Sequence, residues 1–464
     1  MLFNSWIFFL FLPLVFGLLT LVPQRFRWLL LLTASYVFYG WWRADFLLLI
    51  AFSTVLDFYC ARNIDASSDH KIRKRWMLLS VCINLGMLFM FKYFYFFVGS
   101  TPWIQDLVSP HQRIRDFVDF FGKSLPVGIS FYTFQTMSYT LDVYHRRAKP
   151  ETHLGRYALF VSYFPQLVAG PIERFSHLNE QLKASFKPTY INLQNGFRLM
   201  LYGFFVKMVI ADNLSYTVTS VFNEPGKWVW YWDMIGVLSF GFQIYADFFG
   251  YSLIAQGVAM LFGVHLMDNF NRPYLAQNIS AFWKRWHISL STWFRDYVYI
   301  PIGGNRVKHG RWMFNILLVF MLSGLWHGAN YTFLLWGALH GVYYLIERYT
   351  PLRIRSVYLS GLITFLAVSF AWIFFRSADL TQAGNVIKGM FGMLEGHRQL
   401  DTQPFIFLLL LIFGALELFR GNARFDAFCT RFNALQRWTL YCFMLFCILV
   451  FCGSEYQAFI YFRF

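Results

Sequence analysis

The sequence predicts an all-α polytopic membrane protein with about eleven transmembrane or re-entrant helices. Two observations lead to this class. First, 57% of the 464 residues are hydrophobic, 22% are aromatic and 14% are charged, a composition too apolar for a soluble domain. Second, apolar runs recur from one end of the chain to the other, separated by short polar connections. We therefore expect one membrane domain over residues 1–464 and no soluble domain.

Several of the apolar runs are shorter than the ~20 residues that a full crossing needs. In chain order, the runs include Trp6–Val22, Trp28–Trp42, Phe46–Cys60, Trp76–Val98, Tyr157–Ile172, Trp312–Trp326, Val357–Phe375, Pro404–Phe419 and Trp438–Cys452. Short runs indicate re-entrant or broken helices, which are stable only inside protein or along a cavity. Because Met1–Leu21 lacks a basic start and a small-residue cleavage site, we expect it to be a retained first span.

The basic residues occupy the short connections, and they predict which side of the membrane each connection faces. The net charge of +16 could indicate nucleic-acid binding, but this distribution is typical of cytoplasmic loops that also meet anionic membrane lipid. We assign to the cytoplasm the clusters within Arg62–Arg75, Arg146–Lys149, Arg272–Arg311, Arg348–Arg355 and Arg420–Arg437. No nucleic-acid partner is expected. The six cysteines show no metal-ligand spacing, so we expect them to be packing residues, with no metal site and no disulfide.

The stretch SGLWHGANYTF, residues 323–333, places His327 in a short apolar hairpin. Between Arg311 and Arg348 lie 36 residues, broken near the middle by Gly328-Ala329-Asn330. A leg of about 17 residues reaches roughly 25 Å at the helical rise of ~1.5 Å per residue. That length does not comfortably cross a hydrocarbon core of ~30 Å. We therefore expect His327 at or near the tip, deep in the membrane or toward its far side.

An ionisable group inside a membrane is costly, so His327 is a functional candidate, with a hydrogen-bonded packing residue as the alternative. Trp326 precedes it, and Ser323 lies one turn earlier on the same helix face. Gly328, which follows, would let another backbone or a substrate approach. His340, in WGALHG, is either a structural residue or a partner of His327.

A second region, NISAFWKRWHISLSTWFRDYVYIPIGG at residues 278–304, predicts an amphipathic helix along the cytoplasmic interface or dipping into the protein. One arc of this helix holds Trp283, Trp286, His287, Leu290, Trp293, Phe294, Tyr297 and Val298, and the opposite arc holds Lys284, Arg285, Ser289, Thr292, Arg295 and Asp296. We expect Ser280 to cap its start and Pro301 with Gly303-Gly304 to end it.

His287 lies on the apolar arc, where a solvated face would not place it, and it is the second catalytic candidate. An interfacial histidine bonded to a carbonyl is the alternative. The basic arc would contact lipid headgroups or the phosphates of a cytoplasmic donor. The candidate substrate-binding residues near the two histidines are Lys284, Arg285, Trp286, Arg295, Ser323, Trp326, Asn330 and His340.

The sequence contains no G-x-S-x-G elbow, P-loop, G-x-G-x-x-G turn or H-E-x-x-H helix, so the common hydrolase, NTPase, dinucleotide and zinc-protease classes are not indicated. A buried imidazole favours its uncharged form and can act as a general base. A hydroxyl that attacks a thioester needs such a base, positioning and help for the oxyanion. The residues thus predict acyl transfer from a cytoplasmic thioester to an alcohol reached from the other face.

Several stretches carry a resemblance when they are taken together in order. They are MLFNSWIFFLFLP, LPVGISFYTFQTMSYTLDVY, FPQLVAGPIERF, YADFFGYS, RPYLAQNISAFWKRWHISLSTWFRDYVYIPIGGNR and LSGLWHGANYTFLLWGALHG. This series resembles the membrane-bound O-acyltransferase (MBOAT) family, specifically its bacterial alginate O-acetyltransferase branch. The likeness reaches to about Arg376, with the signature region at about 125–376. The family's signature histidine falls on His327, and its upstream histidine falls on His287.

The resemblance implies a helical fold around a central tunnel, in a multi-pass protein of the bacterial inner membrane. It implies acetyl-CoA as the acyl-donor substrate, entering from the cytoplasm, with no bound cofactor. The acetyl group would serve O-acetylation of an exported polysaccharide, alginate-like in the first place, and pass through a periplasmic SGNH-type acetyltransferase or acceptor protein. Peptidoglycan O-acetylation by the same chemistry is the alternative.

A transporter for a lipid-linked sugar or acyl group, without catalysis, is the rival from another class. Lys92, Asp142, Lys207 and Asp247 could line its pathway, but the sequence shows no inverted repeat. A non-catalytic scaffold would not need the WKRWH and WHG motifs. We expect residues 377–403 and the tail EYQAFIYFRF to be extracytoplasmic and one or both to contact the periplasmic partner.

Overall fold

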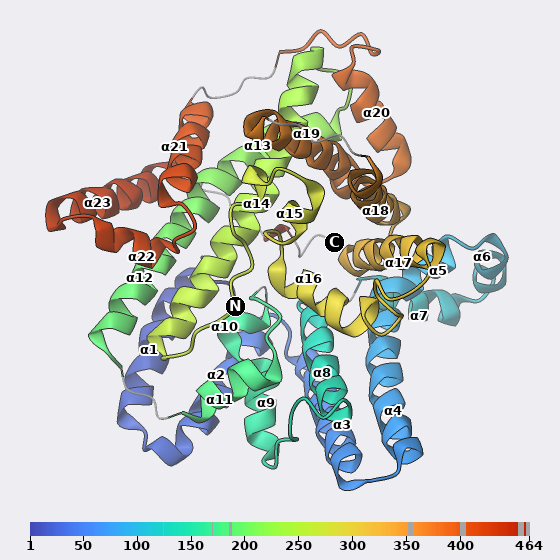
Figure 1. Cartoon of the computed structure of the whole chain (residues 1–464), viewed down its shortest axis with the longest axis vertical. Helices are drawn as coiled ribbons and strands as arrows, with labels where there is room; N and C mark the ends of the chain where they lie inside the picture. Colours follow the sequence, from blue (N-terminus) through green and yellow to red (C-terminus); the bar gives the residue numbers. More distant parts are fainter. Residues whose placement is uncertain are drawn as a thin grey trace. The chain divides into compact units, whose positions relative to one another are not determined.

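The computed structural model describes residues 1–123, 125–168, 170–184, 188–350, 356–399, 405–452 and 459–460. Within these ranges every regular element is a helix, and the β contact recorded there is an isolated bridge between Trp228 and Arg398 (Figure 1). The predicted all-α class is confirmed. The chain forms two compact units. Unit 1 comprises residues 1–196 and 255–267, and unit 2 comprises residues 197–254 and 268–464.

Unit 1 is built from the N-terminal helices. They are α1 (Trp6–Leu21), α2 (Arg27–Gly40), α3 (Leu47–Ala66), α4 (His70–Leu88), α5 (Phe94–Gly99), α6 (Pro102–Val108), α7 (Gln112–Lys123), α8 (Ile129–Tyr144), α9 (Leu154–Ser162), α10 (Phe164–Leu167) and α11 (Phe175–Lys183). Local side chains set their starts, since Ser5 accepts from the Phe8 N–H at α1 and Asp69 accepts from the Lys71 N–H at α4.

The helices α3, α4 and α8 lie side by side in unit 1 (Figure 1) and enclose a buried polar cluster. The Asp57 carboxylate of α3 accepts hydrogen bonds from the Ser80 hydroxyl at 2.6 Å and from the Asn84 amide at 2.9 Å, both on α4. Polar groups buried in an apolar bundle are stable only when they are paired in this way. The cluster therefore explains the polar residues within these apolar runs.

The run Tyr157–Ile172, predicted as a span, is broken into the short helices α9 and α10. Tyr163 between them has a non-helical backbone (φ −51°, ψ 109°), and the Phe164 N–H donates to the Ser35 hydroxyl of α2. Pro165 follows, and it has no N–H to offer to a continuing helix. The expectation that runs too short for a full crossing form broken, buried helices is confirmed here.

The remaining helices are those of unit 2, with the division between the units falling inside α12 and α14. They are α12 (Tyr190–Phe204), α13 (Asp212–Asn223), α14 (Trp230–Leu261), α15 (Ile279–Trp283), α16 (Ile288–Phe294), α17 (His309–His327), α18 (Tyr331–Tyr349), α19 (Val357–Arg376), α20 (Leu380–Met390), α21 (Phe405–Arg420), α22 (Phe425–Phe428) and α23 (Ala434–Phe451). A π-helical segment, Phe205–Ala211, joins α12 to α13, and another, Arg295–Tyr299, continues α16.

Five helical segments among the described residues are long and apolar enough to cross a membrane. They are Ala44–Ala66, His70–Gly99, Trp230–Leu261, Val357–Arg376 and Ala434–Phe451, and Trp6–Leu21 is a shorter apolar helix. These segments support a multi-pass membrane protein, but they do not confirm about eleven spans. The predicted cytoplasmic cluster at residues 348–355 and the C-terminal tail fall largely outside the described residues.

The helix α14, 32 residues long, is not among the apolar runs named from the sequence, although its Asp247 was considered as an intramembrane residue. Its hydropathy is interrupted by acidic residues, among them Asp247. That carboxylate is buried and pairs with Lys207 at 2.6 Å, while Lys207 also pairs with Asp212 at 2.6 Å. Buried ion pairs of this kind let a helix carry charge inside a membrane, so hydropathy alone understates such a span.

Candidate active site

The predicted hairpin is present, with His327 at its tip. The helices α17 and α18 are each 19 residues long and pack against each other, and the last residue of α17 is His327. The turn between them consists of Gly328, Ala329 and Asn330. Close packing of the two legs depends on glycine, because a Cβ on Gly324 would overlap the Phe333 carbonyl oxygen. The location of His327 at the turn is therefore confirmed.

The side chain of Asn330 is engaged in the turn itself. Its Oδ1 accepts from the Thr332 N–H at 3.2 Å, which caps α18, and its Nδ2 donates to the Ala378 carbonyl at 2.6 Å. An N-cap of this type satisfies a backbone donor that the helix leaves unpaired. These bonds tie the hairpin tip to the segment after α19, and substrate contact by Asn330 stays a prediction.

The predicted amphipathic helix over residues 278–304 is not continuous, because it breaks at His287. This residue has a left-handed backbone (φ 41°, ψ 56°) between α15 and α16. The Ile288 N–H turns away to donate to the Asn269 carbonyl at 2.9 Å, and the Ser289 hydroxyl donates to the Asn269 Oδ1 at 2.6 Å. The predicted N-cap is also wrong, since Asn278 accepts from the Ala281 N–H at 2.7 Å.

Most of the predicted apolar arc is nevertheless buried. The buried members are Trp286, His287, Leu290, Trp293 and Phe294. Ser289, assigned to the polar arc, is 1% exposed, and this assignment is wrong because the break at His287 changes the helical phase. On the basic side, Lys284 and Arg295 are exposed and Arg285 is half-buried. Arg295 also pairs with Asp296 at 2.8 Å.

The two catalytic candidates meet in unit 2. The ring centroids of His287 and His327 lie 6.3 Å apart, and their exposed fractions are 0% and 3%. The indole of Trp326 contacts both imidazoles, at 5.9 Å from His287 and 5.0 Å from His327. Phe248 of α14 packs edge-on against His287 at 4.7 Å. Apolar surroundings of this kind disfavour protonated imidazole and favour the neutral base.

A group of aromatic rings encloses His327 on its other sides. Trp336 and Phe375 each lie 5.2 Å from the imidazole, and Trp336 stacks on Trp372 at 5.5 Å. Trp372 in turn packs against Trp286 at 5.0 Å. The predicted residue Trp286 therefore belongs to the aromatic packing that joins the two histidine segments. Ser323, one turn before His327, is also buried.

His340 lies beyond Trp336, whose ring contacts His327 at 5.2 Å and His340 at 5.0 Å. The His340 Nδ1 accepts from the Trp283 Nε1 at 3.3 Å. These contacts favour the structural alternative for His340 over partnership with His327. Its Nε2 makes no hydrogen bond within the described ranges.

A cavity of about 460 Å³ in unit 2 was not predicted. Its lining includes Tyr245, Arg272, Tyr274, Phe365 and Glu417. Tyr274 packs between this cavity and Trp286, with ring centroids 6.1 Å apart. Glu417 is held by Arg420 at 2.9 Å and by the Tyr245 hydroxyl at 2.7 Å. The signal in the sequence was the RPYL stretch, which places Arg272 and Tyr274 just before the histidine segment.

The chain is also similar in sequence to known proteins. Residues 145–376 match the profile of "MBOAT, membrane-bound O-acyltransferase family", a range that contains both histidines. The chain is 39% identical over 447 residues to the "Probable alginate O-acetylase AlgI" of Pseudomonas aeruginosa, covering 90% of this chain and 82% of that protein. The protein of the same description in Azotobacter vinelandii is 41% identical over 401 residues, which cover 84% of this chain and 78% of that protein. The "Peptidoglycan O-acetyltransferase" of Helicobacter pylori is 35% identical over 399 residues, which cover 79% of this chain and 73% of that protein.

Proposed function

Because this chain belongs to the membrane-bound O-acyltransferase family and is an acyltransferase, we propose that it transfers acetyl groups from cytoplasmic acetyl-CoA for O-acetylation of an exported polysaccharide. An alginate-like exopolysaccharide is the proposed final acceptor, on the basis of the relatives described as alginate O-acetylases. The inner membrane of a bacterium is the proposed location. The relative from Helicobacter pylori makes peptidoglycan the second candidate acceptor.

The pair of buried histidines carries this proposal. We assign the general base to the neutral imidazole of His327, which takes the proton of the acceptor hydroxyl as its oxygen attacks the thioester carbonyl. The carbon–sulfur bond then breaks and the coenzyme A thiolate leaves, taking up a proton. His287, with its ring centroid 6.3 Å from that of His327, donates an N–H to the oxyanion that develops on the carbonyl. The aromatic rings around both imidazoles keep water from the thioester.

The donor is proposed to reach this pair from the cytoplasmic side of unit 2. Arg272 and Tyr274 of the cavity lining belong to residues 272–311, which the basic residues assign to the cytoplasm, and the guanidinium of Arg272 lies among aromatic lining residues. An extended thioester arm fits such a lining, while Lys284, Arg285 and Arg295 supply positive charge for its phosphates. Ring contacts run from Tyr274 at this cavity through Trp286, Trp372 and Trp336 to His327, and the thioester arm is proposed to follow these rings.

The acceptor side is proposed to be the side of the hairpin tip. The Asn330 amide joins that tip to Ala378 at the start of residues 377–399, so this segment and His327 are held together. Phe391 and Met393 in the same segment are 67% and 70% exposed. Exposed apolar side chains on a polar loop are suited to contact with a protein partner, which we propose to be a periplasmic SGNH-type acetyltransferase.

Three of the four residues that suggested the rival transporter pathway, Asp142, Lys207 and Asp247, are held in ion pairs. Lys207 and Asp247 form a closed ion pair at 2.6 Å, completed by Asp212 and by the Ile460 N–H, which donates to Asp247 at 2.7 Å. Breaking a buried network of this kind is costly, which favours a structural role for these charges. In unit 1, Asp142 lies 3.9 Å from Arg147 near the end of α8.

The test is transfer of label from acetyl-CoA in proteoliposomes that contain the cognate periplasmic acceptor. The variants are His327→Ala and, as a matched control, the exposed histidine variant His111→Ala, at equal amounts of folded protein. Loss of a general base should lower the rate by about 10² to 10⁴-fold in His327→Ala and leave His111→Ala unchanged. Equal transfer by both variants would remove His327 from the chemistry. Flux of a lipid-linked sugar without acetyl-CoA would replace the enzyme proposal by a transporter.

A further inference from the structure

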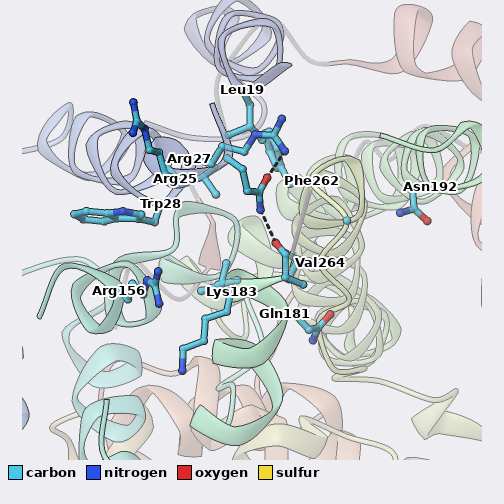
Figure 2. Close-up of a pocket in the computed structure, with 15 residues that line it drawn as sticks. Leu19, Arg25, Arg27, Trp28, Arg156, Gln181, Lys183, Asn192, Phe262 and Val264 are labelled. Atoms are coloured by element: carbon cyan, nitrogen blue, oxygen red, sulfur yellow. Dashed lines mark hydrogen bonds between the residues drawn. The ribbon is translucent and has the colours of Figure 1, made fainter. Parts of the chain in front are cut away.

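A second cavity, of about 290 Å³, lies wholly within unit 1 and has a different chemical character (Figure 2). Figure 2 shows the basic side chains of Arg25, Arg27, Arg156 and Lys183 around it, contributed by different segments of the unit. The described lining residues include no carboxylate. A concave site with four cations and no acid within its lining attracts an anion.

The framework of this pocket is fixed by side-chain amides. Gln181 of α11 donates to the His265 carbonyl at 3.1 Å and accepts from the His265 N–H at 2.8 Å. Gln24, between α1 and α2, donates to the Ala184 carbonyl at 3.3 Å and accepts from Arg27 at 2.5 Å. These bonds join three segments distant in sequence, so the pocket is formed before any ligand enters.

The four basic side chains differ in their hydrogen-bond and ion-pair partners. Lys183 pairs with the buried carboxylate of Glu151 at 2.8 Å, and Arg27 donates to Gln24 and to the Val22 carbonyl. Arg25 and Arg156 have no carboxylate partner among the described residues, and the Arg25 guanidinium lies over the Phe26 ring at 4.8 Å. Two guanidiniums thus remain available to bind phosphate oxygens through their paired N–H groups.

Apolar surface adjoins the cations. Leu19 of α1, Leu31 of α2 and Phe262 line the same pocket. On α1 the nearby Leu18 and Leu21 are 39% and 80% exposed, as expected for a helix that faces acyl chains. A ligand at this position can therefore place a charged group among the guanidiniums and an apolar part along α1.

Trp28 is a further residue that lines the pocket. Its indole packs edge-on against His153 at 4.7 Å and lies across Gly155, where a Cβ would overlap the ring. Tryptophan is enriched at the membrane–water boundary of membrane proteins, where one part of the ring is apolar and the N–H is wet. The start of α9 follows the basic cluster at residues 146–149, which we assign to the cytoplasm, so the pocket faces the cytoplasmic leaflet.

We propose that this pocket binds the phosphate headgroup of an anionic phospholipid from the cytoplasmic leaflet. The phosphate accepts hydrogen bonds from Arg25 and Arg156, and the acyl chains follow the exposed leucines of α1. Anionic lipid is concentrated in that leaflet and attracts basic sites near its surface. The phosphates of a soluble nucleotide share this chemistry, but they lack the apolar part that the pocket and α1 accommodate. The site is separate from acyl transfer and does not depend on the function proposed above.

The test measures lipid bound to the full-length protein in detergent micelles by native mass spectrometry. The probes are phosphatidylglycerol, zwitterionic phosphatidylcholine, coenzyme A and inorganic phosphate. The pocket variant is Arg25→Gln/Arg156→Gln. The matched control is Lys71→Gln/Lys74→Gln, which removes the same charge from exposed positions at the start of α4. We expect the native and control proteins to bind phosphatidylglycerol in preference to phosphatidylcholine. The affinity of the pocket variant for phosphatidylglycerol should be lower by about tenfold or more.

Equal affinity of all three proteins for phosphatidylglycerol would overturn the proposal. Displacement of the lipid by coenzyme A or by inorganic phosphate at comparable concentrations would also overturn it, because the ligand would then be a free phosphate. If the double variant does not fold, Arg156→Gln alone, at an exposed position, should still weaken phosphatidylglycerol binding relative to Lys74→Gln. Lipid binding is read without acyl transfer, so failure here leaves the enzyme proposal unaffected.

Discussion

The imidazoles of His287 and His327 lie 6.3 Å apart although they come from different helical segments. Two local features bring them together. His327 ends α17 at a turn capped by Asn330, and His287 occupies a left-handed break between α15 and α16. The site therefore depends on two interruptions of helix rather than on one regular helix face.

The backbone at His287 offers a way to separate its fold from its chemistry. A left-handed residue other than glycine costs about 1 kcal/mol, so His287→Gly relieves strain while it removes the imidazole. We expect His287→Gly to retain the thermal stability of the native protein more closely than His287→Ala does. Acetyl transfer should fall in both variants, by about 10²-fold or more if the N–H stabilises the oxyanion.

Added imidazole is the discriminating measurement for this pair of variants. In His287→Gly the missing ring leaves space, so free imidazole should restore part of the acetyl-transfer rate. The same addition to His327→Ala is the comparison at the residue proposed as the general base. Full activity of His287→Gly without imidazole would show that this ring takes no part in the reaction.

The position of His327 could be predicted from the sequence because charge and chain direction determine it. The location of His327 followed from the basic residues Arg311 and Arg348 and from the Gly-Ala-Asn break between them. Prediction from the sequence failed where a tertiary contact overrides local periodicity. One continuous helix through His287 was expected. Instead, the Ile288 N–H donates to the Asn269 carbonyl, and His287 has a left-handed backbone that interrupts the helix. A histidine in a left-handed conformation has no signature in a single sequence.

The missed helix and the missed cavity have related physical causes. The helix α14 contains Asp247, whose charge is compensated by Lys207 from another segment, and hydropathy cannot register that pairing. The cavity beside Tyr274 is formed by residues far apart in the chain, so neither its volume nor its lining follows from motif spacing. The residues of the basic pocket in unit 1 are likewise dispersed, and its Arg25 and Arg156 become neighbours of one cavity only in the fold.

The cap at Asn330 should matter for stability through two separable bonds. Asn330→Ala loses both the cap on Thr332 and the bond to the Ala378 carbonyl, and it should lower the free energy of unfolding by about 1 kcal/mol or more. Asn330→Asp keeps the acceptor for Thr332 but cannot donate to Ala378. We expect thermal denaturation to rank the proteins as native, Asn330→Asp and Asn330→Ala in falling order. Equal stability of all three would show that the turn is held by other contacts.

The pair His177 and Glu173 in unit 1 makes stability depend on pH. A hydrogen bond of 2.6 Å to the Glu173 carboxylate raises the pKa of His177 above its ordinary value of 6.5. Since the folded pKa is the higher one, the stabilisation is complete below pH 6.5 and is lost as pH rises through the folded pKa. The melting temperature of the native protein should exceed that of His177→Gln at pH 6, and the difference should shrink by pH 9. A difference that is constant with pH would contradict this.

The close contact of α17 with α18 predicts unequal effects of two glycine substitutions in one hairpin. A Cβ on Gly337 would overlap the Phe320 carbonyl oxygen, whereas one on Gly310 would meet no atom within 4 Å. Gly337→Ala should therefore separate the legs, cost about 1–3 kcal/mol of stability and displace His327 from His287. Gly310→Ala should leave acetyl transfer unchanged and be neutral or stabilising by about 0.5–1 kcal/mol, because alanine favours helix. Thermal denaturation and label transfer on the same preparations check both. If Gly337→Ala matches Gly310→Ala in both measurements, close packing of the legs is not what holds His327 in place.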